Sequence, residues 1–241
     1  MPPPTTVELL WGTAPRPKRG PKPALTLDGI VAEAIALADA DGLSALSMQR
    51  LAERLGFTKM SLYRYVPGKE QLTALMLDAA MGDPPATGGA PAHWRAGLRA
   101  WVEAIFERYR AHPWVIELTL GIRPIGPNEM SWTEAALTAL GGTGLTGPER
   151  LDTIVLLNGH ARSLAQQVES VGGGDSAIQF TEQFTAMMDA AGGRFPAVSA
   201  AFAEESAAAA APSAAPGAAF DYGIERILDG LAVLIARRAD R

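Results

Sequence analysis

The chain of 241 residues has no cysteine, is 48% apolar and 20% charged, and carries a formal net charge of −5. The absence of cysteine excludes disulfides, thiol catalysis and cysteine-based zinc sites. The first residues lack a secretory pattern and no apolar run reaches about 18 residues, so we expect a cytoplasmic protein that does not span the membrane. Alanine is abundant and β-branched residues are sparse, which predicts an all-α fold.

The charges are distributed unevenly along the chain. Residues 1–70 contain nine Lys/Arg and seven Asp/Glu, a net charge of +2, whereas the rest contains 12 basic and 19 acidic residues. Screening limits the reach of a surface charge to about 8–10 Å, so the local balance decides what a surface attracts. The N-terminal part can therefore bind a polyanion although the whole chain is acidic.

Residues 1–24 are rich in proline and show no apolar periodicity, which predicts a flexible, extended arm. The arm contains four cations within seven residues: Arg16, Lys18, Arg19 and Lys22. Such a run is either a solvated tail or, in front of a DNA-binding unit, a segment that lies in the minor groove or along phosphates.

Residues 25–81 predict a helix-turn-helix domain. A first helix begins after Thr26, a short second helix runs from the cap Ser47 to Gly56, and a third covers Lys59–Tyr65. A DNA reader needs such a short helix, with polar residues outward, to enter the major groove, which is about 12 Å wide.

The third helix is expected to use Met60 and Leu62 as anchors against Leu51 and Leu55 of the second. This orientation leaves hydrogen-bond donors on its outer and flanking faces: Thr58, Lys59, Ser61, Tyr63, Arg64 and Tyr65. Lys69 opens the next helix, where a cation opposes the helix dipole. Either this side chain is simply solvated, or it binds a DNA phosphate together with the free amides there.

Residues 82–91 predict a Pro/Gly linker with nothing to bury, and residues 92–241 a larger helical domain. Apolar periodicity predicts helices near 94–112, 114–121, 128–140, 148–170, 175–190, 196–205 and 218–238, with a low-complexity loop at 206–217. The stripes of 148–170 and 218–238 favour a four-helix bundle between two copies of the chain. A core helix within one chain has the same periodicity.

A pocket for a small apolar effector requires apolar walls and a few polar groups. The candidates in this domain are Trp101, Ile105, Met130, Trp132, Asn158, His160, Phe180, Phe184 and Met187. For each aromatic residue an ordinary core position is the simpler interpretation, and His160 fits a hydrogen-bonded or interface histidine better than a metal ligand. We expect no cofactor and no metal.

The stretch from Leu46 to Leu72 resembles the DNA-binding unit of the TetR (tetracycline-repressor) family of regulators, most specifically at Leu62-Tyr63, Tyr65 and Lys69. The resemblance implies a three-helix DNA-binding unit, a C-terminal domain that binds a ligand and forms a homodimer, and a pseudo-palindromic double-stranded DNA operator. It further implies that bases are read by Gln49, Lys59, Met60 and Tyr63, and that phosphates are held by Ser47, Ser61, Arg64, Tyr65 and Lys69.

An enzyme is not expected. Asp152 and His160 lie eight residues apart on one predicted helix, about 12 Å along its axis and too far to pair, and no nucleophile elbow, phosphate loop or zinc motif occurs. The alternative is a helical adaptor that binds proteins, which explains the C-terminal half but not the polar third helix. We therefore expect a ligand-responsive DNA-binding regulator, a repressor released by its effector or an activator.

Overall fold

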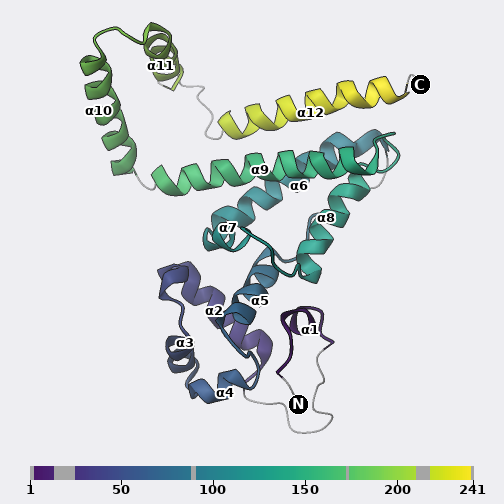
Figure 1. Cartoon of the computed structure of the whole chain (residues 1–241). Coiled ribbons are helices and arrows are strands. Elements are labelled where there is room, and N and C mark those ends of the chain that lie inside the picture. Colours follow the sequence, from purple (N-terminus) through teal and green to yellow (C-terminus); the bar gives the residue numbers. More distant parts are fainter. Residues whose placement is uncertain (1–2, 14–24, 88–90, 172–173, 210–217, 240–241) are drawn as a thin grey trace.

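The computed structural model describes residues 3–13, 25–87, 91–171, 174–209 and 218–239, and every regular element in these ranges is a helix (Figure 1). The α-helices are α1 (Thr6–Leu10), α2 (Leu27–Asp41), α3 (Met48–Leu55), α4 (Lys59–Tyr63), α5 (Lys69–Met81), α6 (Trp94–Ala111), α7 (Trp114–Leu118), α8 (Pro127–Ala139), α9 (Gly147–Val171), α10 (Gly174–Ala191), α11 (Pro196–Ala209) and α12 (Ala218–Ala239). Two short 3-10 helices, η1 (Leu43–Ala45) and η2 (Pro91–His93), precede α3 and α6. The all-α prediction is confirmed.

Three helices of the N-terminal domain begin at a hydroxyl side chain. Thr26, Ser47 and Thr58 are the N-caps of α2, α3 and α4, and each hydroxyl accepts a hydrogen bond from the backbone N–H three residues later, at 3.0, 3.1 and 3.3 Å. Because the first N–H groups of a helix have no partner within it, these caps define where the helices begin. The predicted starts are confirmed, but α4 ends at Tyr63, two residues earlier than expected.

The core of this domain forms where α2 packs against α3 and α5, with α4 packed on α3. Ile30, Leu37, Leu51, Leu62 and Leu72 are completely buried there. Each such side chain stabilises the fold by about 1.5–3 kcal/mol relative to an exposed position. This core holds α3 and α4 in a fixed relation at one end of the molecule (Figure 1).

In the C-terminal domain, α6 packs against α8 and α9, and α9 in turn lies beside α12 (Figure 1). Trp101 on α6 and Trp132 on α8 are almost fully buried, and the indole N–H of Trp101 donates to the carbonyl of Trp132 at 2.8 Å. Arg95 and Arg99 of α6 form ion pairs with acidic side chains of α12. Apolar burial and ion pairs thus together join α6, α9 and α12.

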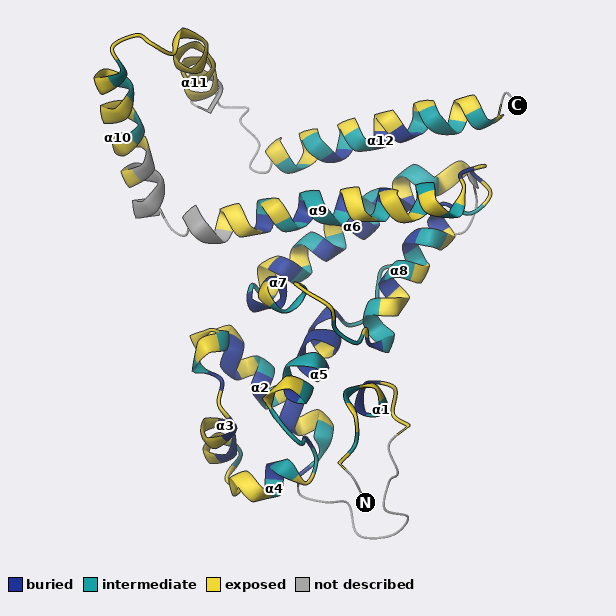
Figure 2. Cartoon of the chain, viewed as in Figure 1, coloured by how far each residue is buried: buried dark blue, intermediate teal, exposed yellow. Residues whose placement is uncertain are grey.

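The two helices α10 and α11 extend away from the rest of the C-terminal domain, and most of their described residues are exposed (Figures 1 and 2). The rings of Phe184 and Phe202 lie with their centroids 4.0 Å apart, so the two helices pack on each other. Both helices occur where the sequence predicts them, and α11 continues to Ala209, into the segment predicted as a loop.

The helix α5 joins the two domains, because it packs against α2 as well as against α7 and α8. The carboxylate of Asp78 accepts hydrogen bonds from the backbone N–H groups of Asn128 and Glu129, at 2.9 and 3.1 Å, and so caps α8. Gly126 is required beside this carboxyl group, since a Cβ atom there would lie 2.2 Å from it. Burial raises the pKa of Asp78.

A second link between the domains involves Asp39 near the end of α2. Its Oδ1 atom accepts a hydrogen bond from the indole N–H of Trp114 at 2.6 Å and lies 2.8 Å from Nδ1 of His112. The α2 helix of the N-terminal domain is therefore joined directly to the start of α7.

The prediction of an extended arm over residues 1–24 is wrong at its beginning. Thr5 and Glu8 form a reciprocal capping box that starts α1, and Leu9 and Leu10 are buried. The helix packs against α5, and the indole N–H of Trp11 donates to the carbonyl of Ile125 at 3.2 Å. A five-residue helix between proline-rich flanks is too short to show a clear period in the sequence.

The prediction that the linker 82–91 buries nothing is also wrong. Thr87 is only 8% exposed, and its hydroxyl donates to the carbonyl of Ala135 on α8 at 2.9 Å. A Cβ atom at Gly97 would lie 2.4 Å from the carbonyl oxygen of Thr87, so α6 requires glycine at this crossing. This hydrogen bond satisfies the buried hydroxyl group of Thr87 and holds the linker against α8.

Candidate DNA-binding surface and effector region

The turn between α3 and α4 has the geometry of a helix-turn-helix. Gly56 ends α3 in the left-handed region, with φ 73° and ψ 25°, a conformation that glycine adopts at least cost. The chain then reverses, and the N-cap Thr58 starts α4 two residues later. Because α4 packs on α3 through the buried Leu62, it presents its opposite face outward.

The sequence-predicted DNA contacts lie within or directly beside α3 and α4 and at the start of α5, at the end of the molecule remote from the C-terminal domain (Figure 2). The exposed members are Ser47, Gln49, Thr58, Lys59, Met60, Arg64 and Lys69, and the half-buried members are Ser61, Tyr63 and Tyr65. The structure therefore brings all ten together on neighbouring elements. Leu62, between them in sequence, is completely buried and is the anchor that the sequence predicts.

The prediction that Met60 also anchors α4 is wrong, because its side chain is 72% exposed. Met60 and Leu62 are two residues apart and thus point to different sides of the helix. The exposed position agrees with the base-reading role that the family resemblance implies for Met60.

The cations of this domain fall into two groups. Arg50 pairs with Asp41 at 2.6 Å and Arg54 pairs with Glu33 at 2.5 Å. The remaining cations of residues 25–87 are Lys59, Arg64 and Lys69, and none of them forms an ion pair with a described residue. The unneutralised positive charge is therefore concentrated on α4 and the first turn of α5.

Lys69 is the first residue of α5, and its N-cap is Gly68, which provides no side-chain cap. The first backbone N–H groups of this helix are therefore not satisfied by a capping side chain. A phosphate oxygen could accept from these N–H groups while it contacts the ammonium group. The proposed arm cations Arg16, Lys18, Arg19 and Lys22 lie outside the described residues.

The predicted effector residues lie on four helices, α6, α8, α9 and α10. Trp101 and Trp132 lie together in the core between α6 and α8 with Ile105 on the same face of α6. Both indole N–H groups already donate to backbone carbonyls, that of Trp132 to Gly82 at 2.9 Å. These residues fit the ordinary core interpretation.

The two polar candidates on α9 also have partners within the chain. Asn158 accepts a hydrogen bond from the hydroxyl of Tyr109 at 2.7 Å. The Nε2 atom of His160 lies 3.2 Å from the carbonyl oxygen of Phe220, and its ring stacks on the Phe220 ring. A Cβ atom at Gly223 would lie 2.2 Å from the imidazole, so His160 packs directly on the backbone of α12. His160 is thus a histidine at a helix interface.

The remaining candidates are dispersed. Met130 is 44% exposed on α8, and Met187 is 56% exposed on α10. Phe184 packs against Phe202 of α11, and the side chain of Phe180 lies outside the described residues. Within the described part of the chain, no group of three or more His, Cys, Asp or Glu residues could hold a metal ion.

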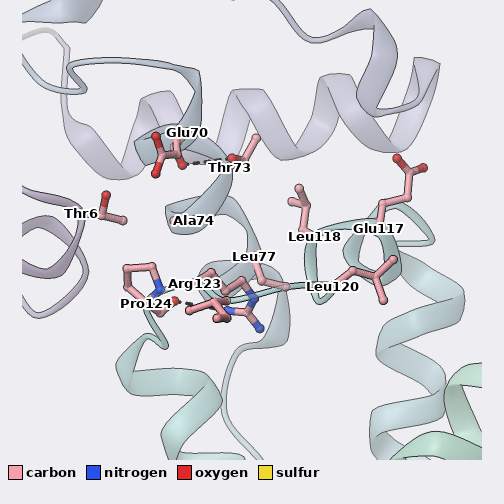
Figure 3. Close-up of a pocket in the computed structure, with 11 residues that line it drawn as sticks. Thr6, Glu70, Thr73, Ala74, Leu77, Glu117, Leu118, Leu120, Arg123 and Pro124 are labelled. Carbon is pink, nitrogen blue, oxygen red and sulfur yellow. Dashed lines mark hydrogen bonds between the residues drawn. The ribbon is translucent and has the colours of Figure 1, made fainter.

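A hollow that the sequence analysis missed lies at the junction of the two domains (Figure 3). It is lined by Thr6, Glu70, Thr73, Ala74, Leu77, Glu117, Leu118, Leu120, Ile122, Arg123 and Pro124. These residues come from α1, α5, α7 and the segment between α7 and α8, so no local pattern in the sequence groups them.

No described helix is long and apolar enough to cross a membrane.

Comparison with known proteins agrees with this architecture. Residues 30–76 match the family described as bacterial regulatory proteins, tetR family, and residues 87–235 match the tetracyclin repressor-like C-terminal domain. The chain belongs to the TetR family. It is therefore a DNA-binding transcriptional regulator with a ligand-binding type of C-terminal domain.

Several relatives are similar over most of their length. The HTH-type transcriptional repressor DrrR1 of Streptomyces coeruleorubidus is 42% identical over 97% of this chain and 87% of its own. A HTH-type transcriptional regulator of Saccharopolyspora erythraea is 31% identical over 73% of this chain and 77% of its own. The TetR family protein ActR of Streptomyces coelicolor, solved in complex with actinorhodin, is 26% identical, with a TM-score of 0.71 over 88% of this chain and 98% of its own.

Proposed function

We propose that this protein is a homodimeric repressor that binds a pseudo-palindromic operator through α3 and α4 and leaves it when a small molecule binds. The observation that carries the proposal is the surface of α4 and the start of α5. There Lys59, Arg64 and Lys69 have no acidic partner among the described residues, and Gln49, Met60 and Tyr63 share the same end of the molecule.

In this proposal, α4 enters the major groove and its early residues meet base edges. Lys59 and Met60 are exposed at the start of the helix, and the Lys59 ammonium lies 5.7 Å from the centre of the Tyr63 ring. Arg64 and Lys69 flank the helix and can contact phosphates, which position the domain without reading sequence. Base contacts thus come from the start of α4, and phosphate contacts come from its C-cap and from the start of α5.

The exposed face of α9 and α12 supports a homodimer. On α9, Leu151, Val155 and Leu156 are between 50% and 68% exposed, and on α12 Val233 is 52% exposed. An exposed apolar patch on a long helix is unfavourable in water and typical of an interface. No atom lies within 4 Å of the Cβ position at Gly159 or Gly230, which leaves space for a second copy to approach.

The release of the operator by an effector rests on how the two domains are joined. The α5 helix begins at Lys69 on the proposed DNA-binding surface, and Asp78 in its last turn is bonded to the start of α8. A small molecule that favours another arrangement of the C-terminal helices would shift α5 and with it the spacing of the two α4 helices. ActR, a similar protein, has been solved with actinorhodin bound.

The test is selection of DNA from a random pool with the full chain, followed by binding measurements on the selected sequence. We expect a pseudo-palindrome, and we expect Tyr63→Ala combined with Lys69→Ala to weaken binding by at least about tenfold. The control is Arg110→Ala, an exposed change on α6. An adaptor protein would select no sequence, and its weak DNA binding would not respond to the double substitution.

A further inference from the structure

The hollow between the domains has the size of a small-molecule site. Its volume is about 220 Å³, and its walls come from α5 on one side and from α7 and the segment after it on the other (Figure 3). An engineered apolar cavity of about 150 Å³ is large enough for benzene. The hollow therefore has room for a molecule of one or two rings.

A buried donor in the wall has no acceptor. The guanidinium of Arg123 is held by both carboxylate oxygens of Glu129, at 2.7 and 2.5 Å, and its Nη1 also donates to the carbonyl of Pro124 at 3.3 Å. Its Nε atom is buried and has no hydrogen-bond partner among the described residues. Arg123 is therefore a fixed part of the wall, and its buried Nε atom is not open to the hollow.

The charge of the walls favours a cation. Glu129 neutralises Arg123, so the uncompensated charges are the carboxylates of Glu70 and Glu117, neither of which forms an ion pair with a described residue. Figure 3 shows these two carboxylates on opposite sides of the hollow. A cleft with one sign of charge and low-dielectric walls concentrates ligands of the opposite sign.

The rest of the wall is apolar. Ala74 and Leu77 of α5 face the hollow together with Leu118 of α7. At the rim, Leu120 is 63% exposed and Ile122 is fully exposed, although both are large apolar side chains. A ligand with an apolar ring would cover these side chains and remove their surface from water.

We propose that this hollow is an effector site for a small amphipathic amine of one or two rings. The rings lie on Ala74, Leu77 and Leu118, and the ammonium group lies near Glu117 or Glu70. The site joins α5, which begins at the DNA-binding surface, to α7 and the α7–α8 segment. Its effect on DNA binding rests on the proposed function, whereas its ligand binding does not.

The direct test uses isothermal titration calorimetry on the full chain with 5-methoxytryptamine as the probe. This probe has two rings, an ammonium group and an ether oxygen, and 5-methoxytryptophol is the matched alcohol without the charge. We expect the amine to bind with a dissociation constant below about 1 mM and at least about fivefold more tightly than the alcohol, since an exposed carboxylate contributes a factor of this size. No binding by the amine, or equal binding of both compounds, would overturn the proposal.

Two substitutions locate the probe. Glu117→Gln removes one carboxylate without changing shape, and we expect amine binding to weaken by about threefold to fivefold. Ala74→Met fills the hollow, and we expect it to weaken the binding of both compounds by at least about tenfold. The matched control is Glu134→Gln, an exposed change on α8 outside the hollow. Binding that is insensitive to both test substitutions would place the probe elsewhere and contradict the proposal.

The DNA experiment separates this proposal from the proposed function. On a selected operator, we expect the amine to change the affinity of the unsubstituted chain and to have no effect on the Ala74→Met chain. If the chain binds its operator but the probe does not bind the hollow, the proposed effector site is refuted and the proposed function is retained. If the probe binds as expected but no operator is found, the proposed ligand site is retained and the proposed function is refuted.

Discussion

Tyr109 of α6 illustrates how burial sets the protonation of a single side chain. It is only 3% exposed, and its hydroxyl donates to Oδ1 of Asn158 on α9 at 2.7 Å. Burial in the apolar core raises the pKa of Tyr109 to about 12, because the charged phenolate would lose its hydration there. The side chain therefore remains a hydrogen-bond donor far above neutral pH.

This pKa predicts how stability changes in alkali. An unfolded tyrosine has a pKa near 10, so between about pH 10 and pH 12 the unfolded state loses this proton while the folded state keeps it. The stability that Tyr109 provides is complete below pH 10 and is lost as the pH rises to 12, by about 2–3 kcal/mol in total. We expect urea unfolding to show this loss relative to Tyr109→Phe, whereas parallel pH curves for the two chains would contradict it.

At the residue scale, the sequence predicts which types of side chain lie on a surface better than it predicts which residues they contact. The polar and basic residues of α4 are where the pattern places them, yet Met60 is exposed rather than buried. The helical period places Met60 and Leu62 on different sides, but a five-residue helix shows too few turns to define which side is buried. The partners of Asn158 and His160 lie 49 and 60 residues away in the chain, so no local pattern reveals them.

At the element scale, Glu149 both caps the start of α9 and joins this helix to α12. The Glu149 carboxylate accepts hydrogen bonds from the backbone N–H and the hydroxyl of Thr146, at 2.8 and 2.9 Å, and it pairs with Arg238 of α12 at 2.5 Å. The N–H of Thr146 and the Arg238 guanidinium lower the pKa of Glu149 to about 2. One side chain thus starts α9 and joins it to the end of α12.

The lowered pKa predicts acid sensitivity of the contact between α9 and α12. The stabilisation is complete above about pH 4.5, the ordinary value for the unfolded chain, and is lost as the pH falls towards 2. We expect the thermal midpoint of the unsubstituted chain to fall more steeply across this range than that of Glu149→Gln. Equal slopes in circular dichroism melts of the two chains would show that Glu149 does not make this contribution.

At the element scale, capping signals predict where the helices α2, α3 and α4 start. Thr26, Ser47 and Thr58 are caps in the structure as in the sequence, and Gly56 ends α3. The helix α1 escapes prediction because Pro2-Pro3-Pro4 and the basic run surround it. Its stability comes from burial of Leu9 and Leu10 against α5, a tertiary effect that overrides local propensity.

At the scale of the whole molecule, the chain is proposed to form a homodimer through α9 and α12. A single substitution that introduces a charge tests this interface. Val155 on α9 is 68% exposed in the single chain. If two copies meet there, Val155→Glu buries an unpaired carboxylate twice across a two-fold axis. We expect analytical ultracentrifugation to show at least about a tenfold weaker dimer.

The control for the interface is Val7→Glu on α1, where the valine is 52% exposed and lies remote from α9 (Figure 1). This change should leave the association unaltered. An equally strong dimer in the Val155→Glu chain would place the interface on another surface.

At the scale of the molecule, the sequence predicts two helical domains but not how they are joined. Asp39 and Trp114 are 75 residues apart, and Asp78 and Asn128 are 50 residues apart, yet both pairs fasten the domains together. The hollow beside this junction combines residues from three distant segments. Periodicity identifies the buried face of a helix but does not identify the helix that covers it.

The central claim is that α4 and the start of α5 hold DNA, and the salt dependence of operator binding tests it most directly. Each phosphate contact contributes a slope of about −0.9 to the logarithm of affinity against the logarithm of salt concentration. For Lys69→Ala in a dimer we therefore expect the slope to become shallower by about 1.8, with the same preferred operator sequence. An unchanged slope together with unchanged affinity would contradict the assignment of this surface to DNA.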